Sequence, residues 1–257
     1  MKRMLGLLWL TLLVFINPGQ AASPQPVTVG GYVFPPYVIV GQDGRPEGIT
    51  LALIAALNEI QNQYQFEFFL TSARRRFQDF EDGKFDMLFF ESMEWGWRSI
   101  GARLDQSPPL LSDDEVWIAL AGEGRDQQFF STLEGRRIAG ILGYHYRFAD
   151  FESDPDVLRK RFDITLVNTN SASIELIMKG RVDQAIVTRS YLNDYLERHP
   201  EYAPRLLVSD FTDQNYSLRM LVRHGVSPGV GELESLLMQL RDAGTLKQLF
   251  RKIAHQP

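Results

Sequence analysis

The sequence predicts an α/β protein built from two similar lobes. Gly83-Lys84-Phe85-Asp86 and Gly180-Arg181-Val182-Asp183 each place a glycine, a long cation, an apolar residue and an aspartate directly before an apolar run. A pattern typical of an amphipathic helix precedes each copy, and the glycine fits the left-handed position that ends a helix. Apolar runs of this length are typical of buried strands. One copy alone could be an ordinary loop, but two distant copies indicate one α/β unit in each lobe.

The first half of the chain is expected to alternate strands with helices. Thr50 favours a helix start because its hydroxyl can accept a hydrogen bond from an unpaired backbone N–H group, and an apolar stripe at helical spacing follows it. The loop before this helix is stiff, because Pro35 and Pro36 fix the backbone. The expected strands cover residues 27–31, 65–70 and 87–90, and the expected helices cover 50–64 and the segment from Thr71 or Ser72 to Gly83.

The second half is expected to repeat this alternation and then return to the first lobe. Extended segments at residues 112–117 and 216–220 cross between the lobes, which makes them candidate hinges. Asp113 and Asp114 fall in the first crossing and are interpreted as solvated turn residues. Leucines at helical spacing, followed by Gly244, predict a helical C-terminus. The other expected elements are strands at 116–120, 137–141, 184–187 and 216–222 and helices at 154–161, 171–179 and 191–197.

The N-terminus has the pattern of a secretory signal. Lys2 and Arg3 precede an apolar stretch at residues 5–16 that is short for a membrane span. Small residues at 19 and 21 suit cleavage after Ala21, and the alternative is a retained membrane anchor. No cysteine is present to carry a lipid. We therefore expect a soluble protein that is exported to the periplasm and is not a lipoprotein.

Composition excludes several kinds of partner and site. The net charge is −5, and the expected signal contributes only cations, so the exported chain is more acidic still. This charge argues against nucleic acid and anionic membranes as partners. The chain has no cysteine and four histidines, and it lacks the motifs of zinc proteases, serine hydrolases and phosphate-binding loops. No metal, disulfide or cofactor is therefore expected, and the protein is expected to be a monomer.

Several short motifs occur in an order that resembles a known family. Arg98 lies twelve residues after Asp86, and a Leu-Arg-x-x-Gly-Thr pattern begins at Leu240. With Pro35-Pro36-Tyr37 and the glycines at 44 and 48, this order resembles the family 3 periplasmic solute-binding proteins. These proteins are the receptors of polar amino acid ABC importers. The resemblance covers residues 27–253.

The resemblance implies the type II periplasmic binding protein fold, also called a Venus flytrap. In this fold two lobes with mixed sheets close on a ligand about a two-strand hinge. Applied to this chain, it implies a signal peptide at 1–21, a first lobe at 22–112, a second lobe at 113–219 and a return to the first lobe at 220–257. The expected partners are a small carboxylate ligand and an ABC transporter permease.

The resemblance also implies a ligand site. Arg98 takes the place of an arginine that forks onto the ligand carboxylate, and a guanidinium suits that role because it offers paired donors and stays charged. The alternative is a surface arginine, or one paired with Glu94. Phe34 takes the place of an aromatic residue that packs on the ligand, or is a core phenylalanine. The residues expected at the ligand are Phe34, Arg75, Glu91, Met93, Trp95, Arg98, Gly143, Tyr144 and Thr188.

Some of these expectations leave alternatives open. Arg75 is the member of the arginine triplet expected in the site, and its two neighbours are interpreted as a solvated basic face. One of Trp95 and Trp97 is expected to line the cleft and the other to pack. Glu91 either replaces a missing ammonium partner or pairs with Arg98 and closes the site.

This chain departs from the family at three places. Met93 and Tyr144 stand where the family has threonines, and Thr188 stands where it has the acid that binds the ligand ammonium. The family's anchor for the ligand carboxylate is therefore present, whereas its anchor for the ligand ammonium is missing or moved. The alternative functions are a ligand sensor that acts on a membrane signalling partner, a degenerate relative that binds weakly, and a dehydratase-like enzyme. Thr188 argues against the enzyme, because the related periplasmic dehydratases use an acid there. Neighbouring transporter genes would favour import over sensing.

Overall fold

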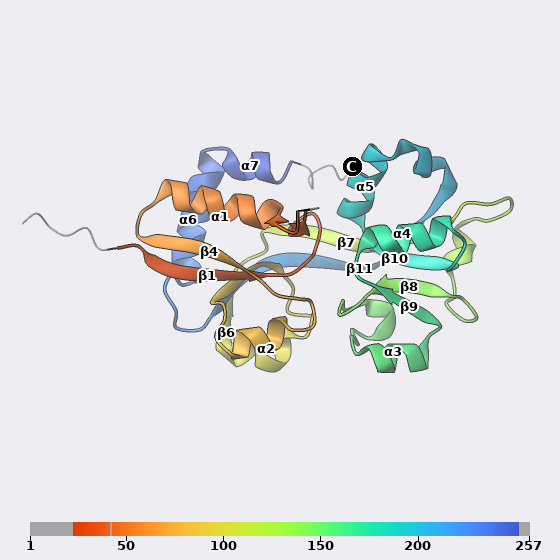
Figure 1. The fold of residues 1–257 in the computed structure, drawn as a ribbon, viewed down its shortest axis with the longest axis horizontal. Coiled ribbons are helices and arrows are strands. Elements are labelled where there is room, and N and C mark those ends of the chain that lie inside the picture. The colour runs from red at the N-terminus through yellow and green to blue at the C-terminus, as the bar shows by residue number, and fades with distance from the viewer. Residues whose placement is uncertain (1–22, 42, 252–257) are drawn as a thin grey trace, which may run out of the picture.

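Two long antiparallel strands run through the centre of the molecule and connect its two lobes (Figure 1). The structure is a computed structural model that describes residues 23–41 and 43–251, so the expected signal peptide lies outside the described residues. β7 (Leu111–Leu120) pairs with β11 (Leu206–Arg223) from one end of β7 to the other. The two predicted crossings are therefore one paired ribbon.

The first lobe is a mixed sheet with helices on both sides. Its elements are β1 (Gln25–Gly31), β2 (Ile39–Val40), β3 (Pro46–Glu47), α1 (Ile49–Ile60), β4 (Tyr64–Leu70), α2 (Arg76–Glu81), β5 (Met87–Glu91), the 3-10 helix η1 (Trp97–Arg103), β6 (Leu104–Gln106), α6 (Val230–Asp242) and α7 (Thr245–Leu249). β1 pairs in parallel with β4 and β5, and β11 pairs antiparallel with β5 and β6. α1 and α7 lie over one face and α2 lies beyond the other (Figure 1). β2 and β3 form a separate two-stranded sheet.

The second lobe repeats this arrangement on the other end of the ribbon. Its elements are η2 (Gln127–Phe130), β8 (Ile138–Ile141), η3 (Arg147–Ala149), α3 (Pro155–Arg161), β9 (Ile164–Val167), α4 (Asn170–Met178), β10 (Gln184–Thr188), α5 (Arg189–Arg198) and η4 (Pro200–Arg205). β10 pairs antiparallel with β7 and parallel with β8, which pairs with β9. α4 and α5 lie above this sheet in Figure 1 and α3 lies below it.

The repeat that predicted two α/β units is confirmed. Gly83 follows α2 with a φ of 73°, and Gly180 follows α4 with a φ of 63°, so both adopt the left-handed conformation that glycine tolerates best. All five residues of β5 and all five of β10 are buried. The lobe boundaries at residues 112 and 219 stay predictions, and both fall within the central ribbon.

Three local predictions are wrong. Thr50 does not cap α1, because the helix begins one residue earlier and follows Gly48 without a side-chain cap. Neither Thr71 nor Ser72 caps α2, which begins only at Arg76; the Thr71 hydroxyl donates instead to Asp79 at 2.5 Å. The return strand begins ten residues before the predicted start at residue 216, because its polar first part pairs with β7.

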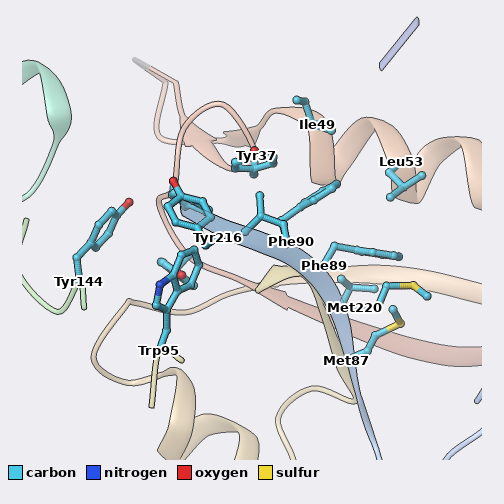
Figure 2. Close-up of a cluster of buried hydrophobic side chains, with 14 of the residues drawn as sticks. Tyr37, Ile49, Leu53, Met87, Phe89, Phe90, Trp95, Tyr144, Tyr216 and Met220 are labelled. Carbon is cyan, nitrogen blue, oxygen red and sulfur yellow. The ribbon is translucent and has the colours of Figure 1, made fainter. Parts of the chain in front are cut away.

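The hydrophobic core of the first lobe extends to the boundary between the lobes. Figure 2 shows it from Leu53 on α1, through Phe89 and Phe90 on β5, to Trp95 and Tyr144. Tyr144 belongs to the second lobe and joins the same buried cluster. The lobes are therefore in direct apolar contact. None of the helices formed by the described residues combines the length and apolar character needed to cross a bilayer.

Candidate functional site

The lobes meet around a small central cavity walled by aromatic side chains. Its volume is about 10 Å³, which is room for about one water molecule. The Tyr144 hydroxyl donates to the Val33 carbonyl of the first lobe at 3.1 Å, and its ring centre lies 5.8 Å from that of Phe34. Figure 2 shows the Tyr144 side chain directed at the cluster that contains Tyr216 and Trp95. The cavity is lined by Tyr32, Phe34, Arg76, Trp95, Glu115, Gly143, Tyr144, His145 and Gln214.

Gln214 on β11 ties the lobes together beside this cavity. Its amide nitrogen donates to the His145 carbonyl at 2.6 Å, and its amide oxygen accepts from the Trp95 indole at 3.3 Å. Burial, together with the charge of Arg76, lowers the pKa of His145 to about 3. The imidazole is therefore neutral at neutral pH.

Arg76 and Glu91 form a buried ion pair behind the cavity. Each side chain is 1% exposed, and Arg76 Nε lies 3.3 Å from Glu91 Oε1. Glu91 also accepts from the Trp97 indole at 2.9 Å. The guanidinium carbon lies 4.7 Å from the centre of the Tyr32 ring and 4.4 Å from that of Phe77, within the range of cation–π attraction. Desolvation raises the pKa of Glu91, against the opposing effect of Arg76.

This ion pair corrects two sequence predictions. Arg76 was expected on a solvated face, but it is the buried member of the arginine triplet, because α2 begins at this residue and turns its side chain toward β5. Glu91 does not pair with Arg98, since its partner is Arg76. Arg75, the member expected in the site, has a side chain that is 71% exposed and pairs with Asp79 at 3.4 Å.

Two buried carboxylates of β7 also lie between the lobes. Glu115 is 2% exposed and accepts hydrogen bonds from the Thr188 hydroxyl at 3.1 Å and the Tyr216 hydroxyl at 3.5 Å. Asp113 is equally buried and accepts from Ser190 Oγ at 2.5 Å, so its interpretation as a solvated turn residue is wrong. Burial raises the pKa of both groups, and the charge of Asp113 raises the pKa of Glu115 further.

A larger groove opens beside the central cavity, with β11 as its floor. Its volume is about 800 Å³, which lies within the range of small-molecule sites. The first lobe contributes Arg98 and Glu94, the second contributes Arg147 and Asp150, and β11 contributes Arg219. Three guanidinium groups therefore face two carboxylates. The groove is lined by Ser92, Met93, Glu94, Arg98, Gln106, Arg147, Asp150, Phe151, Gln214, Asn215, Tyr216, Ser217 and Arg219.

The wall of this groove in the second lobe is a strained loop. Asp150 and Phe151 have φ angles of 56° and 60°, which cost free energy for residues other than glycine. The loop is held to β11 because the Arg147 and Phe148 N–H groups donate to Asp213 at 2.8 and 2.9 Å. Burial raises the pKa of Asp213 to about 6.

The residues expected at the ligand fall into separate places. Phe34, Trp95, Gly143 and Tyr144 line the central cavity, and Trp97 packs in the core of the first lobe. Met93 and Arg98 line the groove, where Arg98 is 70% exposed and pairs with Glu94. The ligand role of each residue stays a prediction. Three of the expected residues line neither the cavity nor the groove. Thr188 donates a hydrogen bond to Glu115, Glu91 pairs with Arg76, and Arg75 lies at the surface.

Sequence reasoning missed Arg76, Glu115, Gln214, Arg147 and Arg219. One feature of the sequence could have indicated that Glu115 belongs to a polar site. Asp113 and Glu115 alternate directly before the apolar run at 116–120, and residues two apart on a strand share one face. Acids at that spacing inside a buried strand indicate a polar site.

Comparisons with known proteins show the fold. No protein-family model matches the sequence, and no curated protein matches it at a significant level. Many solved structures match. One is an ABC uptake transporter substrate binding protein from Streptococcus pneumoniae with bound histidine, 17% identical, with a TM-score of 0.69 over 90% of this chain and 93% of that chain.

Two further structures show the range of this fold. A putative binding component of an ABC transporter from Wolinella succinogenes, complexed with lysine, is 14% identical, with a TM-score of 0.69 over 88% of this chain and 94% of that chain. An ancestral amino acid-binding protein, a precursor of cyclohexadienyl dehydratase, is 18% identical, with a TM-score of 0.65 over 88% and 94%. The chain therefore has the two-lobed α/β fold of these binding proteins.

Proposed function

We propose that this protein is a periplasmic solute-binding protein that holds a small carboxylate-bearing compound, an amino acid or a related compound, between its lobes for an ABC importer. The observation that carries the proposal is the groove of about 800 Å³ with three guanidinium groups, lined by both lobes and the ribbon between them. Structural neighbours that hold histidine and lysine support the choice of ligand class.

The groove is a better place for the ligand than the central cavity. The cavity has a volume of about 10 Å³, whereas sites for whole small molecules usually measure about 300–1,000 Å³. Trp95 donates a hydrogen bond to Gln214, and the Phe34 ring contacts the rings of both Trp95 and Tyr144, so these side chains fill the centre. Of these two spaces, the groove is the one with room for the body of a ligand.

Arg98 is the proposed carboxylate anchor. Its only ion-pair partner among the described residues is Glu94, four residues earlier and also at the surface, and exposed pairs of this kind contribute about 0–1 kcal/mol. A ligand carboxylate can therefore replace Glu94 at little cost. Arg76 is unsuited to this role, because its charge is already matched by Glu91 inside the core. Arg147 forms no ion pair within residues 23–41 and 43–251, so its charge is also available.

A sensory role would use the same groove with a different membrane partner. A sensor and an import receptor would bind the ligand with the same chemistry. They would differ only in the membrane protein that recognises the liganded form. A catalytic role has one structural neighbour in its favour, the precursor of cyclohexadienyl dehydratase. We favour binding without catalysis, since the buried acid Glu115 faces a cavity too small for a substrate.

A thermal-shift panel tests the proposed function. It should include the twenty amino acids, dicarboxylates and aromatic acids. A true ligand at a hundred times its dissociation constant should add about 2.7 kcal/mol of stability, because it binds only the folded state. Simple amines without a carboxylate serve as controls and should give no shift. If no carboxylate-bearing compound stabilises the protein, the proposed function is wrong.

A further inference from the structure

Glu115 is a buried carboxylate with no cationic partner in the part of the chain that the structure describes. It is 2% exposed, and it accepts hydrogen bonds from two hydroxyl groups, those of Thr188 and Tyr216. Among the described residues it forms no ion pair. Burying an ionised carboxylate without a counter-charge is costly, so such a group either stays protonated or receives a cation.

The other charges around the central cavity leave Glu115 uncompensated. Arg76 lines the cavity, but its charge is matched by Glu91 at 3.3 Å. His145 lines it too and is neutral at neutral pH. Asp113 lies close enough on the same strand to repel a charge on Glu115. The net charge of these groups is negative when Glu115 is ionised, so the cavity favours a positively charged group.

The size and walls of the cavity also suit a positive group. A volume of about 10 Å³ matches one water-sized group, and an ammonium head is of that size. Trp95, Phe34 and Tyr144 form the walls, and aromatic ring faces attract cations. Gln214 borders both this cavity and the groove, so the two spaces adjoin.

We propose that Glu115 receives the ammonium group of a ligand whose carboxylate lies in the groove. This inference rests on the proposed function and narrows its ligand class, since it selects zwitterionic amino acids over simple carboxylic acids. The body of the ligand lies in the groove among Arg98, Arg147 and Arg219. Only the ammonium group passes Gln214 into the aromatic cavity.

Amino acids and their deaminated acids, titrated into three proteins, test this inference. The probe pairs are L-leucine with 4-methylpentanoate, L-phenylalanine with 3-phenylpropanoate, and L-glutamate with glutarate, together with 4-aminobutanoate and butanoate. Wild-type protein should prefer the amino compound of the bound pair by about tenfold or more, because a charge-assisted pair forms in a dry site. Glu115→Gln keeps the shape of the side chain and removes its charge, so this preference should disappear.

Glu94→Gln and Asp150→Asn test the rival positions for the ammonium group. They change the two exposed carboxylates of the groove, and both variants should keep the preference for the amino compound. A preference that survives in Glu115→Gln but disappears in Glu94→Gln or Asp150→Asn would place the ammonium group in the groove and overturn the inference. Glu115→Gln should be at least as stable as wild type, because an amide does not ionise. Should it fail to fold, Glu115→Met removes the charge from a side chain of similar length, and a preference that survives there would also count against the inference.

The outcomes separate this inference from the function on which it rests. Deaminated acids that bind wild-type protein as tightly as amino acids would leave the carboxylate site in place and reject the ammonium site alone. Failure of every carboxylate-bearing probe to bind would reject both.

Discussion

Replacing Arg76 with alanine is expected to lower the free energy of unfolding by about 3–5 kcal/mol. The change leaves Glu91 buried without its counter-charge, since the two side chains are each 1% exposed and 3.3 Å apart. It also removes the cation that packs against Tyr32 and Phe77. Urea unfolding followed by circular dichroism measures the loss.

The neighbouring arginine is a matched control for this prediction. Arg75 carries the same side chain one residue earlier, but it is 71% exposed and pairs with Asp79 at the surface. Arg75→Ala should therefore change stability by less than about 1 kcal/mol. Removing both charges in Arg76→Met with Glu91→Gln should cost less than Arg76→Ala alone, because no unpaired charge remains. Equal losses in Arg75→Ala and Arg76→Ala would refute the buried ion pair.

Replacing Arg98 with alanine is expected to weaken ligand binding by about a hundredfold while the fold remains intact. A guanidinium that forks onto a carboxylate forms two charge-assisted hydrogen bonds, and their loss is worth a few kcal/mol. Arg98→Lys should recover only part of the affinity, because an ammonium cannot bind both oxygens in the same way. Titration calorimetry with the amino acid identified in the thermal-shift panel measures the effect.

Arg103 provides the control for Arg98. It lies at the end of the same 3-10 helix, its side chain is 58% exposed, and it pairs with Glu81 away from the groove. Arg103→Ala should bind the ligand as wild type does. Wild-type affinity in a correctly folded Arg98→Ala would remove Arg98 from the site and leave Arg147 and Arg219 as the remaining arginines of the groove.

Much of the fold could be predicted from the sequence, because it depends on patterns that act locally. The glycines at 83 and 180 mark two helix ends, and the apolar runs after them were predicted as buried strands, which is confirmed. The length of β11 could not be predicted, because its polar first part gains its strand conformation from pairing with β7. Tertiary pairing overrides local propensity there.

The site was harder to predict, because it depends on where side chains point. Arg75 and Arg76 are adjacent, and which one is buried depends on the residue at which α2 starts. Arg98 has the spacing of a ligand-binding arginine, but in this structure it pairs with Glu94 on the groove wall. Glu115 could not be identified from the family pattern, because that pattern has its acid at the position of Thr188, whereas the buried acid here lies on the strand paired with Thr188.

A crystal structure of the protein with a bound amino acid would test the central claim most directly, that both lobes hold a small ligand in the groove beside the central cavity. We expect the ligand carboxylate within hydrogen-bonding distance of the Arg98 guanidinium and its ammonium group against the Glu115 carboxylate. A ligand bound by one lobe alone, or outside the groove and cavity, would contradict the account.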